Sequence, residues 1–442
     1  MNTGYIVNKL EKAGRFMLIY TVRAGDSVYG IARAHGVTPE AIVQANGLRE
    51  PYVDQLVIGQ ALIVPTKATS YSVQAGDTLA GIAERFGLTL EALRRANPQI
   101  RDPNRIHTGQ TIRLPRLDFG SIVVNGYARP SARENALDEA LPRLSMISVF
   151  SCYVTAQGGL IPMQGDQPVI DRAKTAGVRP IMVITNLDPG GGFNTQVARE
   201  FLNNPAAHTR LLESCVALMK EKGYTGLDID FEMVPRDARE GLHSFLAQAR
   251  AFMHAEGFLL TSAIESMVRD DQPGLIFEGF DYAVQGKYND YVTIMTYDWG
   301  HLTGPPMAVS PINEVRRVIE FAVTRIPREK ILMGIPAYGY AWKIPWEAGT
   351  RATVIQAQGG PIIAARNGAN IEYNNLWQTP WFRYTEPNGQ QREAWFEDAR
   401  SLLAKFELVH EFGLGGVSYW TVNNPFMQNW TLIDELWKVK KV

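Results

Sequence analysis

The sequence has few of the features that would commit a chain of 442 residues to a disulfide framework, a membrane or a nucleic acid. It contains only two cysteines, Cys152 and Cys215, in no short-range motif, which excludes a disulfide framework and favours buried thiols. No run reaches the roughly 18 continuous apolar residues of a membrane span, and residues 1–16 lack the apolar core of a secretory signal. A formal net charge of -1 provides no attraction for nucleic acid or an anionic membrane, so we expect uncharged partners such as sugars.

Histidine is also scarce, which bears on cofactors. The seven histidines form no cluster with metal-ligand spacing, and the closest pair is His243 and His254. We therefore expect no metal, nucleotide or flavin cofactor.

The chain length exceeds what one hydrophobic core normally holds, so we expect two or more domains. Residues 1–17 precede the first recognisable unit, and are interpreted as a natural extension or a remnant of expression.

Three carboxylates alternate with apolar residues in the segment Gly-Leu-Asp-Ile-Asp-Phe-Glu at residues 226–232. Alternation is typical of a strand, in which Asp228, Asp230 and Glu232 would share one face. Clustered carboxylates inside a protein cost free energy and usually serve a function. A solvated edge strand with an acidic outer face is the alternative, but the apolar residues between the carboxylates disfavour it, and a metal site is not expected.

The first quarter of the chain is a tandem repeat. The segment Tyr-Thr-Val-Arg-Ala-Gly-Asp-Ser-Val at residues 20–28 aligns with Tyr-Ser-Val-Gln-Ala-Gly-Asp-Thr-Leu at residues 71–79, an offset of 71 - 20 = 51 positions. Each unit is interpreted as a strand, a turn that caps a helix, a second helix and a closing strand. Two weak binding modules on one chain raise retention on a polymer through effective concentration.

These repeats resemble LysM modules, which hold N-acetylglucosamine polymers such as peptidoglycan and chitin. The resemblance implies two small βααβ modules at residues 18–66 and 69–116, each with a shallow sugar groove between two loops. The groove residues that it implies are Gly25, Asp26, Ser27, Ile58, Gly76, Asp77, Thr78 and Thr108. In the alternative interpretation Asp26 and Asp77 only cap helices, and a protein-interaction role for the modules stays open.

From residue 120 onward, short aliphatic runs alternate with longer amphipathic stretches, as in β/α units. Eight strands are predicted, at residues 122–127, 147–153, 179–185, 227–232, 259–263, 292–297, 331–335 and 416–420. Helices are expected at residues 133–144, 207–222, 236–255, 312–324 and 393–411. The pattern predicts an α/β fold, a (β/α)8 TIM barrel over residues 118–442 with a small α+β insertion at about residues 341–392, after the seventh strand.

The chemistry of such barrels lies at the carboxyl ends of the strands. Aromatic, acidic and amide residues gather there: Tyr127, Tyr153, Asn186, Glu232, Tyr297, Asp298, Trp299, Tyr338 and Trp420. Any one of these aromatics would more often lie in the core than in a binding site. Their coincidence at predicted strand ends favours a cleft suited to the faces and hydroxyls of a sugar.

The acidic strand, the segment Met-Thr-Tyr-Asp at residues 295–298 and the segment Gly-Gly-Val-Ser-Tyr-Trp at residues 415–420 resemble family 18 glycoside hydrolases. The signature of that family is Asp-x-x-Asp-x-Asp-x-Glu on the fourth barrel strand, and here Thr225 stands in place of the first Asp. Together with the LysM-like repeats, the segments at residues 304–308 and 395–398 make the chain similar to the spore cortex-lytic N-acetylglucosaminidases.

This resemblance implies hydrolysis of β-1,4 bonds that follow N-acetylglucosamine in peptidoglycan, in which the acetamide of the substrate serves as the nucleophile and no cofactor takes part. Glu232 would be the general acid and then the base, Asp230 would orient the acetamide, Tyr297 would bind its oxygen, and Asp228 would tune Asp230. The implied substrate-binding residues are Tyr127, Asn186, Met295, Asp298, Trp299, Tyr338 and Trp420.

Other functions remain open on the sequence alone. A chitinase or an endo-β-N-acetylglucosaminidase would use the same residues, and an inactive wall-binding spore-coat protein is a third interpretation. We expect a monomer that binds peptidoglycan or chitin-like N-acetylglucosamine polymers, without nucleic acid or membrane partners. The resemblance implies a spore-associated or cell-wall location.

Overall fold

The computed structural model describes residues 16–442 apart from 67–69, 87, 89, 116–117 and 189. The chain divides into two compact units, one ending at Asp118 and one comprising Phe119–Val442. Most of the predicted extension, residues 1–17, lies outside the described residues; its last two residues, Phe16 and Met17, belong to the first strand.

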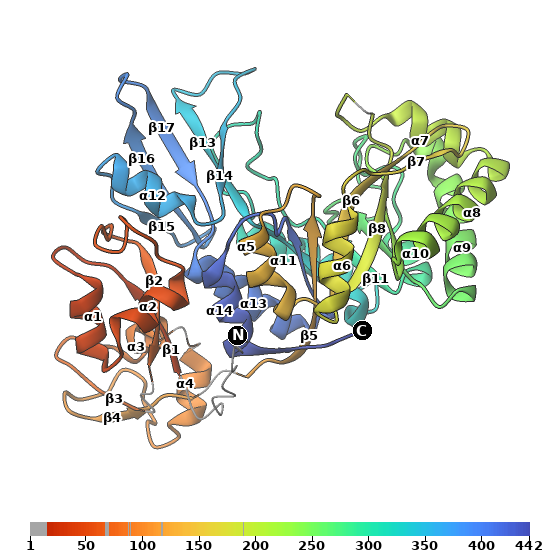
Figure 1. Cartoon of the computed structure of the whole chain (residues 1–442). Helices are drawn as coiled ribbons and strands as arrows, with labels where there is room; N and C mark the ends of the chain where they lie inside the picture. Colours follow the sequence, from red (N-terminus) through yellow and green to blue (C-terminus); the bar gives the residue numbers. More distant parts are fainter. Residues whose placement is uncertain (1–15, 67–69, 87, 89, 116–117, 189) are drawn as a thin grey trace, which may run out of the picture. The chain divides into compact units, whose positions relative to one another are not determined.

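The amino-terminal unit contains the predicted tandem modules. In each, two strands pair antiparallel and two short helices connect them. The first module comprises β1 (Phe16–Thr21), α1 (Val28–His35), α2 (Pro39–Asn46) and β2 (Ala61–Thr66). The second comprises β3 (Ser70–Ser72), α3 (Leu79–Arg85), α4 (Leu90–Ala96) and β4 (Thr111–Arg113), which confirms the βααβ order (Figure 1).

The turn before the first helix of each module corrects one interpretation. Ser27 caps α1, because its hydroxyl oxygen accepts a hydrogen bond from the backbone N–H of Gly30. Asp26 instead accepts from the hydroxyl of Tyr20 at 2.8 Å and thereby ties the turn to β1. The second module repeats both contacts one turn before α3, so helix capping by the two aspartates is wrong.

The second unit is a closed barrel of eight parallel strands, which confirms the predicted (β/α)8 fold (Figure 1). The strands are β5 (Gly120–Ala128), β6 (Met146–Val154), β8 (Arg179–Thr185), β9 (Gly226–Asp230), β10 (Leu259–Ile264), β11 (Tyr291–Ile294), β12 (Ile331–Pro336) and β18 (Gly416–Trp420). Closure follows from β5, which pairs with both β6 and β18. Two short strands, β7 (Leu160–Ile161) and β19 (Trp437–Val439), extend the sheet.

Helices connect the barrel strands (Figure 1). They are α5 (Glu134–Ala140), α6 (Gln167–Thr175), α7 (Thr195–Leu202), α8 (Pro205–Lys222), α9 (Arg239–Ala255), α10 (Tyr282–Tyr288), α11 (Ile312–Ala322), α13 (Ala399–Phe412) and α14 (Met427–Leu436), with short 3-10 turns at Leu141–Arg143, Arg236–Ala238 and Arg328–Lys330. The helix predicted at residues 393–411 begins too early, because Asp398 and Ser401 form a capping box that starts α13 at Ala399.

The insertion after the seventh barrel strand is a five-stranded antiparallel sheet with one helix. It comprises β13 (Tyr338–Ile344), β14 (Thr353–Gln356), α12 (Gly359–Arg366), β15 (Glu372–Asn374), β16 (Thr379–Thr385) and β17 (Gln391–Trp395). It therefore starts three residues before, and ends three residues after, the predicted bounds of 341–392.

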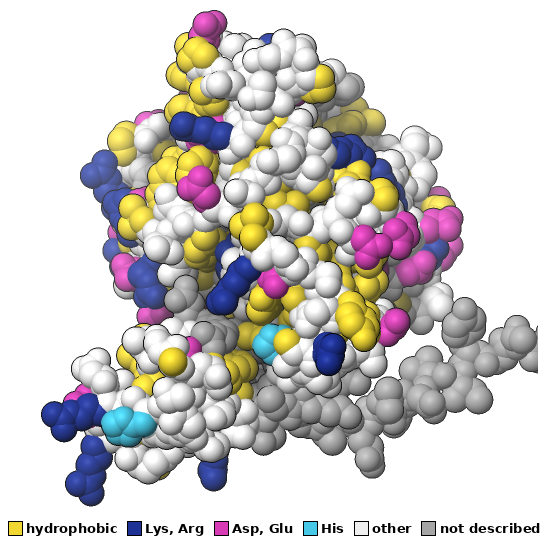
Figure 2. Space-filling view, turned by 90° about the vertical axis from the view of Figure 1, so that its left-hand side faces the viewer, with side chains coloured by type: hydrophobic (Ala, Val, Ile, Leu, Met, Phe, Trp, Pro, Cys, Tyr) yellow, Lys and Arg dark blue, Asp and Glu magenta, His cyan; other side chains and the backbone are white. Residues whose placement is uncertain are grey.

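The distribution of charged side chains on the surface agrees with the formal net charge of -1. On the face that Figure 2 shows, cationic and anionic side chains are interspersed, and neither sign forms a continuous field. None of the helices in the described part of the chain combines the length and the apolar character that crossing a bilayer requires.

Candidate active site

Asp228 and Asp230 lie on β9, and both are nearly inaccessible to solvent, with exposed fractions of 1% and 3%. Strand β9 ends at Asp230, so the predicted strand 227–232 is two residues too long. Glu232 lies just beyond the strand end and is partly exposed. The three carboxylates thus extend from the buried barrel interior to the mouth of the barrel.

Asn186, immediately after β8, holds the backbone of Glu232. Its side-chain oxygen accepts from the Glu232 N–H at 3.0 Å, and its amide nitrogen donates to the Glu232 carbonyl at 2.9 Å. A further hydrogen bond to the Asn194 carbonyl fixes the same amide. Asn186 is completely buried, so this predicted sugar-binding residue supports the Glu232 backbone and is not exposed to a sugar.

Asp228 accepts hydrogen bonds from two hydroxyls. Tyr127 donates to one of its oxygens at 2.8 Å, and Thr261 donates to the other. Burial raises the pKa of Asp228 to about 6, and the two hydroxyl donors oppose that rise. Tyr127 is itself only 2% exposed, so this predicted sugar-binding residue is buried, and its hydroxyl is already bonded to Asp228.

The Asp230 carboxylate is buried but is not fully hydrogen-bonded within the described residues. Its Oδ1 atom is buried and has no hydrogen-bond partner among the described residues. Burial, followed by the charges of Asp228 and Glu265, raises the pKa of Asp230 well above its usual range. A buried acceptor without a donor costs free energy, so a ligand N–H that reached this oxygen would relieve the cost.

Glu232 shares the mouth of the barrel with Glu265, which follows β10 directly. Ser262 of β10 is in register with Ile229 of β9, and continuing that register brings Glu265 level with Glu232. Burial, then the charges of Asp230, Glu265 and Asp298, raises the pKa of Glu232 well above its usual range. Burial raises the pKa of Glu265 to about 7. Both groups therefore retain protons under conditions in which exposed carboxyls are ionised.

The segment after β11 carries four predicted residues. The strand ends at Ile294 rather than residue 297, and Met295 then packs against the buried cluster around Tyr127. The ring of Tyr297 lies where a Cβ on Gly334 would come within 2.8 Å of it, so the glycine makes room for the ring. Burial and then Asp230 raise the pKa of the Tyr297 hydroxyl, which therefore remains a proton donor.

Asp298 has a left-handed backbone conformation, with φ at 64°, a conformation that is strained for most side chains. Its carboxylate accepts hydrogen bonds from Tyr338 at 2.7 Å and from Tyr340 at 3.4 Å, both on the first strand of the insertion. Strained residues persist where neighbours hold them, and they cluster at functional sites. Trp299 is partly buried, and in the described part of the chain its side chain makes no hydrogen bond to the acidic residues.

Trp420, at the end of β18, lies in an aromatic cluster. Its ring centroid is 4.8 Å from that of Phe150 in an edge-to-face arrangement and 5.5 Å from that of Tyr127. Trp420 and Phe150 are both partly exposed, whereas Tyr127 is buried. Phe150, on β6, and Tyr340, on β13, were not among the predicted site residues.

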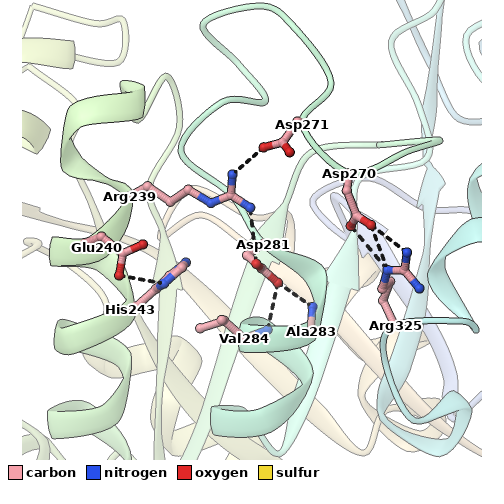
Figure 3. Close-up of polar contacts among 9 residues, drawn as sticks. All are labelled: Arg239, Glu240, His243, Asp270, Asp271, Asp281, Ala283, Val284 and Arg325. Carbon is pink, nitrogen blue, oxygen red and sulfur yellow. Dashed lines mark hydrogen bonds and ion pairs between the residues drawn. The ribbon is translucent and has the colours of Figure 1, made fainter.

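The loop between β10 and α10 begins at Glu265 and is fastened by ion pairs (Figure 3). Arg239 on α9 reaches Asp271 at 2.9 Å and Asp281 at 3.2 Å, and Arg325 pairs with Asp270. Asp281 also caps α10 through the backbone N–H groups of Ala283 and Val284. These ion pairs fasten the loop to α9 and to the segment that follows α11.

The predicted sugar groove of each LysM-like module is bounded by two adjacent loops. In the first module the Gly59 N–H donates to the Val22 carbonyl at 2.8 Å, which brings Ile58 close to the turn at Gly25. Ile58 is 43% exposed, and Tyr29, which was not predicted, is 67% exposed. The second module repeats the loop contact through Gly109 and Val73, so Gly76, Asp77, Thr78 and Thr108 occupy the corresponding positions.

Among the residues that the structure describes, no group of three or more histidines, cysteines, aspartates and glutamates has an arrangement suited to a metal ion.

Comparison with known proteins relates this site to carbohydrate enzymes. The family model "Glycosyl hydrolases family 18" matches residues 183–424, and the LysM domain model matches residues 20–65 and 71–115. The chain is 36% identical over 429 residues to the putative sporulation-specific glycosylase YdhD of Bacillus subtilis (strain 168), with 96% of this chain and 100% of that protein covered. It is also 36% identical over 434 residues to the cortical fragment-lytic enzyme of the same organism, covering 96% of this chain and 99% of that protein.

A solved structure of a similar enzyme has the same fold as this chain. The crystal structure of the Bacillus cereus spore cortex-lytic enzyme SleL superposes with a TM-score of 0.87 at 34% sequence identity, covering 96% of this chain and 99% of that one. These matches confirm the resemblances of both the amino-terminal modules and the barrel that the sequence motifs indicated.

Proposed function

The chain belongs to glycosyl hydrolase family 18 and carries two LysM domains, and on that premise we propose that it hydrolyses β-1,4 bonds that follow N-acetylglucosamine in peptidoglycan, with spore cortex fragments as its substrate. Two relatives support this substrate, because their names refer to cortical fragments or the spore cortex and they match over almost the whole of both chains. The observation that carries the reaction is the buried, unpartnered Oδ1 of Asp230 beside Glu232.

The acetamide of the substrate acts as the nucleophile in this proposal. A retaining glycosidase with an enzymic nucleophile places two carboxyl groups on opposite sides of the bond, whereas substrate-assisted members of this family need only one acid. Here Asp228, Asp230 and Glu232 all come from one strand and its end. The acetamide oxygen attacks the anomeric carbon as the bond to the leaving oxygen breaks, and an oxazolinium ion forms on the same sugar.

Glu232 first gives its proton to the leaving oxygen. It then accepts a proton from the water that opens the oxazolinium ion, and the product keeps the configuration of the substrate. A general acid must be protonated at the working pH, and the raised pKa of Glu232 supports that role. The two hydrogen bonds from Asn186 fix the backbone from which Glu232 reaches the bond.

Asp230 and Tyr297 bind the acetamide from two directions. The free Oδ1 of Asp230 accepts the acetamide N–H, which stabilises the positive charge that develops on that nitrogen. The Tyr297 hydroxyl, held protonated by its raised pKa, donates to the acetamide oxygen. Each oxygen of Asp228 already accepts a hydrogen bond, one from Tyr127 and one from Thr261. Asp228 therefore remains behind Asp230 and carries a negative charge or shares a proton with it.

Trp420 provides the face on which the N-acetylglucosamine ring packs, and Met295, Asp298, Trp299 and Tyr338 border the same position. The LysM modules hold the enzyme on the polymer through the paired loops of their grooves. Association with the spore or the cell wall follows from these two binding functions, and a single copy of the chain carries every residue that the mechanism uses.

Products from cortical fragments and from chitin oligomers, compared side by side by mass spectrometry, test the proposal. Cortical fragments should yield products with N-acetylglucosamine at the new reducing end, at rates well above those on chitin oligomers. Comparable or faster cleavage of chitin would favour a chitinase, release of glycans from glycoproteins would favour an endo-β-N-acetylglucosaminidase, and binding without any cleavage would indicate an inactive wall-binding protein.

A further inference from the structure

An arginine for which the described residues provide no acidic partner lies at the edge of the aromatic cluster. Arg129 follows β5 directly, and its guanidinium carbon is 6.0 Å from the ring centroid of Phe150 and 6.0 Å from that of Trp420. Its side chain is exposed, and within the described part of the chain no ion pair or side-chain hydrogen bond engages the guanidinium. The five N–H donors of the group therefore face solvent beside the proposed sugar-binding ring.

The backbone beneath Arg129 is anchored. Its N–H donates to the side-chain oxygen of Asn423 at 3.0 Å, and its carbonyl accepts from the Ala132 N–H at 2.9 Å. The Arg133 N–H donates to the Asn423 carbonyl at 3.2 Å, so the loop after β5 is fastened to the loop after β18 at both ends. The guanidinium is thus presented from a fixed backbone, while its own donors remain unused.

Two other arginines of the barrel unit differ in this respect. Arg239 and Arg325 are each paired with aspartates that fasten the loop between β10 and α10 (Figure 3). Among the described residues, the Arg129 guanidinium has only two aromatic rings as partners, each at the outer limit of the distance at which a cation interacts with a ring. A carboxylate can displace such a contact, because a guanidinium binds the two oxygens of a carboxylate through parallel N–H donors.

We propose that Arg129 binds a carboxylate of the muramic sugar that adjoins the N-acetylglucosamine in the cleavage position. This inference rests on the proposed function, because the two sugars of peptidoglycan alternate and both neighbours of a given N-acetylglucosamine are muramic sugars. The carboxylate comes from the lactyl group or from the peptide attached to it. Chitin offers a neutral acetylated sugar at the same place, so Arg129 selects the anionic glycan over chitin.

The test compares Arg129→Gln with the wild type on four soluble oligomers of equal length. Their muramic sugars carry a free lactyl carboxylate, a stem peptide or a neutral lactam, and the fourth oligomer is chitin. The variant should lose about ten-fold in kcat/KM on the carboxylate-bearing oligomers and change less than about two-fold on the lactam and on chitin. Loss on only one of the first two oligomers identifies which carboxylate is bound.

Two further variants distinguish the effect of the Arg129 guanidinium from the effect of any positive charge in the same loop. Arg129→Lys keeps a positive charge but loses the planar guanidinium and its parallel N–H donors, so it should retain part of the preference for carboxylate-bearing oligomers. Arg133→Gln removes the same charge from an exposed side chain four residues further on and should leave the preference unchanged. The preference of the wild type should also shrink as salt rises, since an exposed ion pair is screened.

An equal loss on all four oligomers, or no loss on any, would overturn the role of Arg129. A wild-type enzyme that leaves every muramic oligomer intact would instead contradict the proposed function, and the role of Arg129 would fail with it. The two failures are distinguishable, because the first appears in the variant and the second in the wild type.

Discussion

Asn186 binds both backbone polar groups of Glu232, the N–H at 3.0 Å and the carbonyl at 2.9 Å, in the way that one residue of a strand pairs with another. The contact continues the pairing of β8 with β9 beyond the last backbone pair, Thr185 with Asp230. The main chain can therefore leave the sheet at Glu232 without exposing unsatisfied groups, and the side chain of Glu232 starts from a fixed point.

Asn186→Ala should lower both stability and turnover. The substitution leaves the Glu232 N–H and carbonyl without partners, which costs about 1–3 kcal/mol of unfolding free energy. We expect kcat to fall more than KM rises, because the acid is displaced while the acetamide contacts remain. Denaturation curves and steady-state kinetics on a soluble oligomer measure the two effects.

Asn194→Ala is the matched control for this variant. The Asn194 side chain caps α7 through the N–H groups of Gln196 and Val197, and within the described residues it makes no hydrogen bond to Glu232. The backbone hydrogen bonds that join Asn194 to Asn186 remain when alanine replaces Asn194. Its loss should cost about 1 kcal/mol of stability, as for other helix caps, with kcat almost unchanged. A fall in kcat equal to that of Asn186→Ala would mean that the clamp acts only through general stability.

Glu232→Gln removes the proton donor and preserves shape. General acid–base catalysis is typically worth about 10²- to 10⁴-fold, so kcat should fall at least that far while sugar binding persists. Tyr297→Phe and Asp230→Asn should lower kcat and also weaken an oxazoline-mimicking thiazoline, because they contact the acetamide. Near-normal turnover of Glu232→Gln would assign the acid to another residue, with Glu265 the first to examine.

Glu265→Gln should shift the pH dependence of turnover. Above a pH of about 7, where Glu265 is ionised, its charge adds to those of Asp230 and Asp298 in raising the pKa of Glu232. With glutamine in its place, Glu232 loses its proton at a lower pH, so the descending limb of the kcat profile should move toward lower pH. Asp270→Asn, in the same loop but paired with Arg325 at the surface, should leave the limb in place. A movement toward higher pH would contradict the electrostatic account.

A protein that begins at Asp118 should separate binding from catalysis. The chain divides into compact units at that residue, so the barrel should fold alone and cleave soluble oligosaccharides at the rate of the full chain. Without the LysM modules it should no longer sediment with insoluble peptidoglycan. Unchanged sedimentation of the shortened protein would place the anchoring surface on the barrel.

The barrel could be predicted from the sequence because most of its strands are short, largely aliphatic runs, as a parallel sheet buried on both faces requires. Strand β9 is an exception, since it carries carboxylates at alternate positions. All eight predicted strands are present, as are the strands and helices of the tandem modules. The residues at which strands begin and end were harder to predict. Tyr338 reads as the end of the seventh barrel strand, yet β13 begins there only two residues after β12 ends, because it pairs with strands of the insertion that are distant in the sequence.

The motifs in the sequence identified candidate catalytic residues, but they did not predict the contacts that hold those residues in place. Asn186 was expected to bind sugar, and nothing in its local sequence indicates that its amide faces Glu232, 46 residues further on. Glu265 gave a signal, a carboxyl group directly after a predicted strand, but only the pairing of β9 with β10 brings it level with Glu232. Contacts of this kind depend on register between strands, which one segment alone does not determine.

The central claim is retaining hydrolysis after N-acetylglucosamine with the acetamide as nucleophile. Proton NMR of cortical fragments during the first minutes of digestion reports both the sugar at the new reducing end and its anomeric configuration. The account predicts N-acetylglucosamine in the β configuration as the first product. An initial α anomer, or a muramic sugar at the new reducing end, would contradict it.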